Sequence, residues 1–306
     1  MNTPPGSGTP PELWTPKTIL DWCEPYFRKH QIPSPRLDAE LLLSHVLNCR
    51  RIDLYLQFDR PLDSDELERF RGLVRARATR EPVAYLTGEA GFWGLTLHIQ
   101  PGCLVPRPET ETLVEQALAV ISELREDPAE PFRIVEMGSG SGAIPLALCA
   151  DAQNLWVVAT EKSREAMAVA ATNRGRHAGK IAEGKNRIDL ILADGLEPLL
   201  PAFQPRLILS NPPYIPSDVI PTLEPEVARF EPKMALDGGQ DGLDPHRYLM
   251  EKAAVCLSQG GRLLMEIGYD QGEGVRKLAE AHSRLKLIGI EKDLGGRDRI
   301  AHFEKA

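Results

Sequence analysis

Apolar residues in the first quarter of the chain recur every three or four positions, which is the spacing of amphipathic helices. Three helices are expected, beginning after Thr15, Ser34 and Asp63, because each of these residues can cap a helix and the first two precede a proline. Residues 14–88 are therefore predicted to form a small helical domain. The side chains expected to face inward are Ile19, Trp22, Cys23, Tyr26 and Phe27 in the first helix, Leu37, Leu41 and Leu42 in the second, and Leu67, Phe70 and Val74 in the third.

Two polar features accompany this domain. Residues 1–13 are rich in Pro, Gly, Ser and Thr, which predicts a disordered leader. A solvent-exposed face is predicted for the arginines of the third helix, because helices carry their charge outward, and a docking surface is the alternative. These arginines are Arg69, Arg71, Arg75, Arg77 and Arg80.

From residue 89 onward, short apolar runs alternate with helical patterns. Because helices separate the strands, the predicted class is α/β, with a parallel sheet covered on both faces, over residues 89–306. A pair of short strands is expected first, within 91–99. Helices are then expected at 110–125, 143–151, 163–177 and 244–258, and strands at 133–137, 155–160, 187–192, 206–210 and 261–267, with an antiparallel last strand near 300–303.

A glycine-rich segment, Gly138-Ser139-Gly140-Ser141-Gly142, follows the first strand of this sheet and precedes a helix. Glycines let the backbone turn tightly near a ligand, and the helix N-terminus presents free N–H groups to it. Gly138, Gly140 and Ala143 also match the dinucleotide pattern, so the loop alone does not distinguish NAD from S-adenosylmethionine. Glu161 ends the next strand about 20 residues later, where a carboxylate can bind the ribose hydroxyls of an adenosine-bearing cofactor.

The tetrapeptide Asn211-Pro212-Pro213-Tyr214 follows the strand expected at 206–210. Its prolines remove two N–H donors, so the groups left at this strand end are acceptors, namely the Asn211 side-chain oxygen and backbone carbonyls. Acceptors can hold both hydrogens of a planar –NH2 group, and Tyr214 offers a ring against which a flat amide or base can pack. The segment therefore indicates methylation of an amide or amino nitrogen. It disfavours a dehydrogenase, which has no use for a donor-poor loop.

These residues lie within a set of motifs that resembles the HemK/PrmC family of protein-(glutamine-N5) methyltransferases, which act on peptide chain release factors. The resemblance runs from about residue 14 to the end of the chain. Asn-Pro-Pro-Tyr is shared with adenine-N6 DNA and RNA methyltransferases, whereas Pro-Arg-Pro-Glu-Thr-Glu at 106–111 is more specific. The motifs are 36–42, 81–88, 105–111, the glycine loop, 211–214, 231–232, 236–239, 241–243, 266–269 and 293–299.

The resemblance implies a seven-stranded class I methyltransferase (Rossmann-like) sheet and an N-terminal helical domain that recognises the partner protein. It also implies that S-adenosyl-L-methionine is the methyl donor and leaves as S-adenosyl-L-homocysteine. The substrate amide is assigned to Asn211, Pro212, Pro213 and Tyr214, with Asn211, Pro212 and Tyr214 as catalytic residues. The implied cofactor-binding residues are Gly138, Ser139, Gly140, Ser141, Gly142, Glu161, Asp194, Gly195 and Asn211.

Two positions depart from the family pattern. Glu136 stands where Asp is usual, so its carboxylate reaches one methylene further and contacts to the methionine half of the cofactor are expected to change. Gly195 stands where an aromatic residue often flanks the adenine, so stacking from that side is not expected. Asp194 can still accept a hydrogen bond from the adenine amino group.

Charge and composition narrow the choice of partner. The net charge is -8, and residues 12–88 hold 12 basic and 12 acidic side chains, so the acidic excess lies in the larger part of the chain. An acidic surface favours a basic protein partner over nucleic acid, which ranks an adenine-N6 DNA or RNA methyltransferase second. Five scattered cysteines without a C-x-x-C pair, and no apolar run of about 18 residues, predict a cytoplasmic protein with no metal site and no membrane contact. A monomer is expected.

Overall fold

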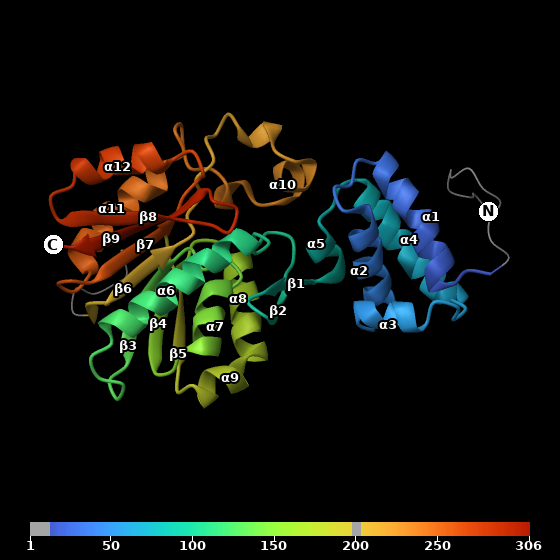
Figure 1. Cartoon of the computed structure of the whole chain (residues 1–306), viewed down its shortest axis with the longest axis horizontal. Helices are drawn as coiled ribbons and strands as arrows, with labels where there is room; N and C mark the ends of the chain where they lie inside the picture. The colour runs from blue at the N-terminus through green and yellow to red at the C-terminus, as the bar shows by residue number, and fades with distance from the viewer. Residues whose placement is uncertain (1–12, 198–202) are drawn as a thin grey trace. The chain divides into compact units, whose positions relative to one another are not determined.

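The computed structural model describes residues 13–197 and 203–306 and divides into two compact units, Met1–Gly88 and Glu89–Ala306 (Figure 1). Apart from Leu13, the predicted leader lies outside the described residues. Each unit has an apolar core of its own. Across the described ranges, no helix is both long enough and apolar enough to cross a membrane.

The described part of the first unit is helical. Its first helix is capped by the Thr15 side chain, which accepts from the Thr18 N–H, and its fourth by Asp63, which accepts from the Glu66 N–H. All three predicted helix starts are confirmed, although Ser34 makes no capping hydrogen bond to the second helix. The helices are α1 (Pro16–Lys29), α2 (Pro35–Leu47), α3 (Arg51–Leu56), α4 (Ser64–Ala78) and α5 (Val83–Thr87).

The core of this unit differs from the sequence prediction in the second helix. Leu37 is 39% exposed, because the buried stripe of α2 is rotated away from it. The stripe consists of Ala39, Leu42, Leu43 and Val46, which are spaced by three or four positions as one helical face requires. The other buried members of this core include Ile19, Leu20, Cys23, Phe27, Phe70 and Val74.

Two of the five arginines at α4 are buried, contrary to the prediction of a wholly solvent-exposed set. The Arg77 Nε donates to Asp38 Oδ2 of α2 at 2.8 Å, and both residues are less than a tenth exposed. Arg80, just beyond α4, donates to the backbone oxygen of Gln31 at 2.9 Å. The exposed arginines are Arg69, Arg71 and Arg75. Arg77 and Arg80 therefore hold the helical unit together and are not part of its outer surface.

Replacing Arg77 with alanine is expected to lower the free energy of unfolding by ~3–5 kcal/mol, because it removes the guanidinium that faces the buried Asp38 carboxylate. Arg75→Ala, on the exposed side of the same helix, is the matched control and should change stability by no more than ~0.5 kcal/mol. Urea unfolding of the two variants, with hydrogen exchange of the α2 and α4 amides, measures the difference. Equal stability of the two variants would show that the buried pair contributes nothing.

The second unit begins with the antiparallel hairpin of β1 (Glu89–Phe92) and β2 (Leu95–His98). Its main sheet has seven strands among the described residues, in the order β5-β4-β3-β6-β7-β9-β8. Pairing is parallel from β5 to β7, and β9 is antiparallel to both β7 and β8. The predicted Rossmann-like sheet with an antiparallel last strand is confirmed. Its strands are β3 (Phe132–Met137), β4 (Leu155–Glu161), β5 (Arg187–Leu192), β6 (Leu207–Ser210), β7 (Arg262–Glu266), β8 (Leu285–Lys292) and β9 (Asp298–Lys305).

Helices cover both faces of this sheet, which is why its central strands are rich in apolar residues. All residues of β6 and β7 are buried. One apolar cluster joins the sheet to α6 (Glu111–Leu124) and α7 (Ala143–Asp151), and another joins it to α11 (Asp244–Cys256) and α12 (Gly272–Glu280). The remaining helices are α8 (Arg164–Arg176), α9 (Ala178–Glu183) and α10 (Pro225–Phe230). The elements β8, α9, α10 and α12 were not predicted from the sequence.

The strand order reverses between β3 and β6, since β4 and β5 lie to one side of β3 while β6 and β7 lie to the other. Open α/β sheets bind ligands at such a reversal, outside the carboxyl ends of the strands. The glycine loop follows β3, Glu161 ends β4, Asp194 follows β5 and Asn211 follows β6. The topology therefore gathers four separately predicted features along one edge of the sheet.

Candidate active site

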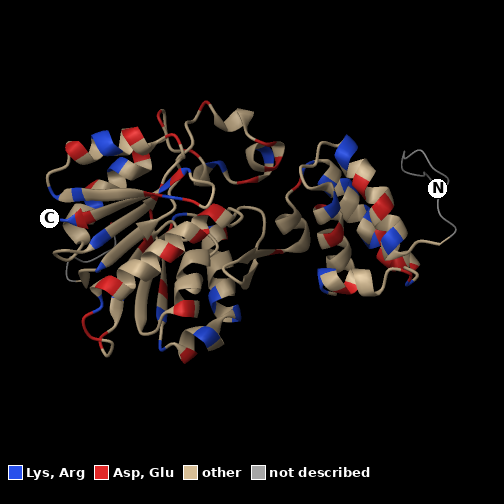
Figure 2. Ribbon diagram, viewed as in Figure 1, with Lys and Arg blue, Asp and Glu red and all other residues tan. Residues whose placement is uncertain are grey.

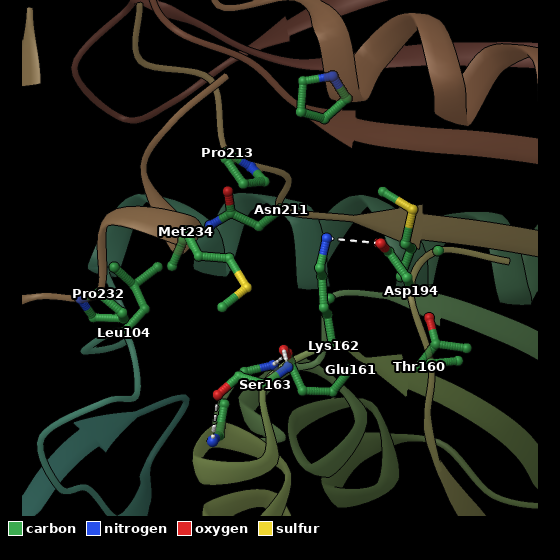
Figure 3. A pocket seen from close by; sticks show the side chains of 18 of the residues that line it. Leu104, Thr160, Glu161, Lys162, Ser163, Asp194, Asn211, Pro213, Pro232 and Met234 are labelled. Atoms are coloured by element: carbon green, nitrogen blue, oxygen red, sulfur yellow. Dashed lines mark hydrogen bonds and ion pairs between the residues drawn. The ribbon is translucent and has the colours of Figure 1, made fainter. Parts of the chain in front are cut away.

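A cavity of about 810 Å³ opens along this edge (Figure 3). Its size falls within the range of small-molecule sites. Figure 3 shows Asn211 and Pro213 on the opposite side of the cavity from Glu161 and Ser163. Further lining comes from the chain after β2, from residues 232–237 and from the start of α11. The lining residues that the sequence had singled out are Gly138, Gly140, Glu161, Asp194, Gly195, Asn211 and Pro213.

The glycine loop is held by the end of the neighbouring strand. Gly138 and Gly140 adopt φ angles of 76° and 53°, a region that glycine enters without steric cost. The Gly138 N–H donates to the Thr160 oxygen at 2.9 Å, and the Gly140 N–H donates to Glu161 Oε2 at 2.8 Å. The other oxygen of Glu161 accepts from the Ser163 N–H at 2.8 Å. Glu161 therefore links the glycine loop to the start of α8 and also lines the cavity.

The remaining loop residues lie away from the cavity. Ser139 and Ser141 are buried at 5% and 4% exposure, and neither belongs to the lining. Gly142 packs against α8, where a Cβ atom at this position would lie 3.4 Å from the Ala170 Cβ. Within this structure these three residues shape the turn, while Gly138 and Gly140 face the open space.

The acid that precedes the loop lies beneath it. Glu136 is fully buried, and neither of its carboxyl oxygens has a hydrogen-bond partner among the described residues. Burial, together with the nearby charge of Glu161, raises the pKa of Glu136 well above its ordinary value. Its side chain is not part of the cavity lining. Burial therefore favours the protonated form of the Glu136 carboxyl relative to a carboxyl at the surface.

An aromatic ring borders the cavity beside Gly195, although it comes from a different element than the family pattern suggests. A Cβ atom at position 195 would lie 2.1 Å from the hydroxyl oxygen of Tyr248, which belongs to α11. That hydroxyl accepts from the Leu196 N–H at 2.9 Å. Glycine at 195 thus makes room for the Tyr248 ring. Asp194 is largely exposed and pairs with Lys162 at 2.7 Å.

The Asn-Pro-Pro-Tyr segment divides into two parts. Asn211 and Pro213 line the cavity, and the Asn211 Nδ2 donates to Thr110 Oγ1 at 2.9 Å. Pro212 is buried, and Tyr214 points away, with its hydroxyl donating to Glu266 Oε1 at 3.4 Å. Neither Pro212 nor Tyr214 lines the cavity in this structure. Burial raises the pKa of Tyr214, so its hydroxyl remains a donor.

Three residues of this region were not among the predicted site residues, namely Thr110, Tyr248 and Glu266. Thr110 and Glu266 belong to the motifs at 105–111 and 266–269, so a signal for them was available. No sequence signal was available for Tyr248, because it belongs to a helix and lies 52 positions after Leu196, the residue that its hydroxyl contacts. The 105–111 motif also contributes Arg107, which forms an ion pair with Glu231, next to the lining residue Pro232.

The Rossmann-like sheet, the glycine loop after its first parallel strand, the acid after the second and Asn-Pro-Pro-Tyr after the fourth define a class I methyltransferase. The fold is similar to that of the hMettl16 catalytic domain in complex with MAT2A 3'UTR hairpin 1. The two share a TM-score of 0.52 and 12% identity over 69% of this chain and 74% of that one. Within this class, the chain belongs to the release factor glutamine methyltransferase family.

Family membership rests on similarity over most of the chain. The release factor glutamine methyltransferase of Geobacter sulfurreducens is 38% identical, covering 94% of this chain and 98% of the relative. That of Xylella fastidiosa strain 9a5c is 42% identical over 87% of this chain and 91% of its own length. The family model described as the PrmC N-terminal domain matches residues 18–88. The resemblance inferred from the motifs is confirmed.

Proposed function

We propose that this protein transfers the methyl group of S-adenosyl-L-methionine to the side-chain amide nitrogen (N5) of the glutamine in the Gly-Gly-Gln motif of translation release factors. One observation carries the proposal. Asn211 lies across a single cavity from Glu161, so a methyl donor and a planar amide can meet between them (Figure 3). The relatives named release factor glutamine methyltransferase, at 34–42% identity, support the choice of substrate.

The cavity residues fit S-adenosyl-L-methionine. A Cβ atom added at Gly138 or Gly140 would meet no protein atom within 4 Å, so the loop leaves open space where a ligand can approach its backbone. The carboxylates of Glu161 and Asp194 suit the ribose hydroxyls and the adenine amino group, and the Tyr248 ring offers the adenine an apolar wall. The bound cofactor supplies an electrophilic methyl group on a sulfonium sulfur and becomes S-adenosyl-L-homocysteine.

The Asn-Pro-Pro-Tyr segment would hold the nucleophile. The side-chain oxygen of Asn211 can accept one hydrogen of the substrate –NH2 group, and a backbone carbonyl of the segment would accept the other, with Pro213 in the cavity wall. Both acceptors together orient the nitrogen lone pair toward the methyl group. Positioning of this kind contributes up to ~7–11 kcal/mol in favourable intramolecular models. Tyr214 does not line the cavity, and it would contribute by holding the segment in place.

A release factor suits this site as partner, and nucleic acid suits it less well. A glutamine must reach Asn211 in an extended loop, and flanking glycines carry no side chain to block the entrance. The helical domain at 14–88 would bind the rest of the factor, and the methyltransferase domain at 89–306 would carry out the transfer. The protein would act as a cytoplasmic monomer. Basic side chains of the larger unit are interspersed with acidic ones (Figure 2), whereas duplex binding favours a continuous basic groove.

Intact-mass analysis tests this function. A whole release factor incubated with the protein and S-adenosyl-L-methionine should gain the mass of one methyl group at the Gly-Gly-Gln glutamine. A factor with alanine in place of that glutamine is the matched control and should gain nothing. A short peptide of the tip should react much more slowly, because it lacks the surface that the helical domain would bind. Methyl incorporation into adenine of DNA or RNA, in place of the glutamine, would overturn the assignment.

A further inference from the structure

The side chain of Gln271 joins three separate stretches of backbone beside the active site. Gln271 directly precedes α12 and is 9% exposed. Its Nε2 donates to the Tyr214 oxygen at 2.9 Å and to the Gly242 oxygen at 3.1 Å. Its Oε1 accepts from the Gly268 N–H at 2.8 Å. The donor and the acceptor of this buried amide are both used, and all three partners are backbone groups.

Gly242 shows how closely these stretches approach one another. It has a φ of 73°, which favours glycine, and a Cβ atom there would lie 2.4 Å from the Tyr214 oxygen and 2.6 Å from the Gln271 Nε2. The junction therefore has no room for a side chain at position 242. The motifs 211–214, 241–243 and 266–269 meet here, at a glutamine that belongs to none of them.

Tyr214 and Gly242 also mark the two ends of a long loop, residues 215–241. The base of this loop is closed by backbone pairing. The Ile215 N–H donates to the Leu236 oxygen at 3.0 Å, and the Gly238 N–H donates to the Ile215 oxygen at 2.9 Å. Gln271 adds two hydrogen bonds on the side of the sheet, one to each end of the loop. The amide therefore fixes the place at which the loop leaves and rejoins the sheet.

The same loop forms one wall of the cavity. In Figure 3, its Met234 lies toward Asn211 and away from Asp194. No residue of α10 is buried, so this helix is not held by apolar packing. The loop is held instead by its base and by the Arg107–Glu231 ion pair. The lining residues that it supplies are Pro232, Met234, Ala235 and Asp237.

We propose that Gln271 is a positioning residue for the substrate side of the active site, which fixes the Asn-Pro-Pro-Tyr segment relative to the loop at 215–241. Two prolines with fixed φ angles separate Asn211 from Tyr214, so a displacement of the Tyr214 carbonyl is transmitted to Asn211. Gln271 itself does not line the cavity. The proposal rests on the proposed function, because it assumes that Asn211 binds the amide of the release factor.

Gln271→Met tests this role, because it keeps the length of the side chain and removes the amide. The kcat/KM for the whole release factor is expected to fall by ~10- to 100-fold, since small displacements of a positioning group have effects of this size. The calorimetric affinity for S-adenosyl-L-homocysteine should be unchanged. Thr160 and Glu161 hold the glycine loop by hydrogen bonds in which Gln271 takes no part.

Asn186 provides the matched control, because its amide makes the same kinds of contact at the opposite end of the sheet, just before β5. It is also 9% exposed. Its Nδ2 donates to the Cys149 and Ala152 oxygens at 3.1 and 2.9 Å, and its Oδ1 accepts from the Leu155 N–H at 2.8 Å. Asn186→Leu should therefore lower the midpoint of thermal unfolding about as much as Gln271→Met, with the kcat/KM of the parent protein.

Gln271→Glu gives a second readout, which a purely structural role would not move. An ionised carboxylate has no hydrogen for the Tyr214 or Gly242 oxygen and repels both. A protonated carboxyl group can donate to one of them and still accept from the Gly268 N–H. The activity of this variant relative to the parent protein should therefore rise as the pH falls. The relative activity of Gln271→Met should not depend on pH.

The outcomes separate the positioning role from the proposed function. If the parent protein fails to methylate the release factor, the proposed function is wrong. The positioning role alone is overturned if the parent protein is active but Gln271→Met and Asn186→Leu have the same kcat/KM. It is also overturned if Gln271→Met loses affinity for S-adenosyl-L-homocysteine in proportion to its activity, or if Gln271→Glu gains nothing at lower pH.

Discussion

Asn211→Ala is expected to reduce kcat for release-factor methylation by ~10²-fold or more, because it removes the proposed preorganised acceptor for the substrate –NH2 group. Single-turnover methylation of the whole factor measures this loss. The affinity for S-adenosyl-L-homocysteine should change much less, since the glycine loop and Glu161 keep their mutual hydrogen bonds. The loss should therefore appear in the chemical step and not in cofactor binding.

A second variant separates the acceptor at position 211 from its anchor. Asn211→Asp keeps a side-chain oxygen for the substrate but loses the Nδ2 donor to Thr110. Its kcat should lie between those of the parent protein and Asn211→Ala. Near-normal turnover by Asn211→Ala would exclude the role given to this amide.

Gly140→Val is expected to abolish detectable binding of S-adenosyl-L-homocysteine in titration calorimetry. Gly140 lines the cavity, and a Cβ atom there meets no protein atom within 4 Å, so the valine side chain would occupy space that the proposed cofactor needs. The protein itself should remain folded. Catalysis should be lost together with binding, in contrast to the effect of Asn211→Ala.

The control for Gly140→Val must share its backbone strain. Gly140 has a φ of 53°, where a β-branched residue is disfavoured by roughly 1–2 kcal/mol. Gly260 has a φ of 70° and equally open surroundings, but it precedes β7 at the end of the sheet opposite the cavity. Gly260→Val should therefore lose similar stability and still bind the ligand. Unchanged affinity in Gly140→Val would remove the glycine loop from the cofactor site.

The sequence predicted the features that depend on chain order. In a parallel sheet the ends of successive strands lie at one edge, so a glycine loop, Glu161 and Asn211 placed after three such strands had to lie close together. Helix starts with a capping side chain were predicted for the same reason, because a cap acts within a few residues of its own position. The signal was local in each case.

Features that depend on distant partners could not be predicted in this way. Arg77 looked like a surface residue, because nothing near it in the sequence shows that Asp38, 39 positions away, faces it. Tyr248 of another element fills the space beside Gly195. The glycine in the sequence shows that no side chain is present at position 195, but it does not show which residue occupies that space instead. The direction of the Tyr214 hydroxyl depends on Glu266, which arrives with a later strand.

The pairing of β6 affects how the sheet assembles while the chain is being synthesised. Ser210 lies 73 positions after Met137, whose carbonyl its hydroxyl contacts, and β6 pairs on its other side with β7, which begins at Arg262. While the ribosome adds the residues between them, one side of this strand remains unpaired. Its residues are Leu, Ile, Leu and Ser, without a charge to discourage pairing with another chain. The strand that leads into Asn211 is thus open to mispairing while the nascent sheet is incomplete, and the segment that positions the proposed substrate site also carries an aggregation risk.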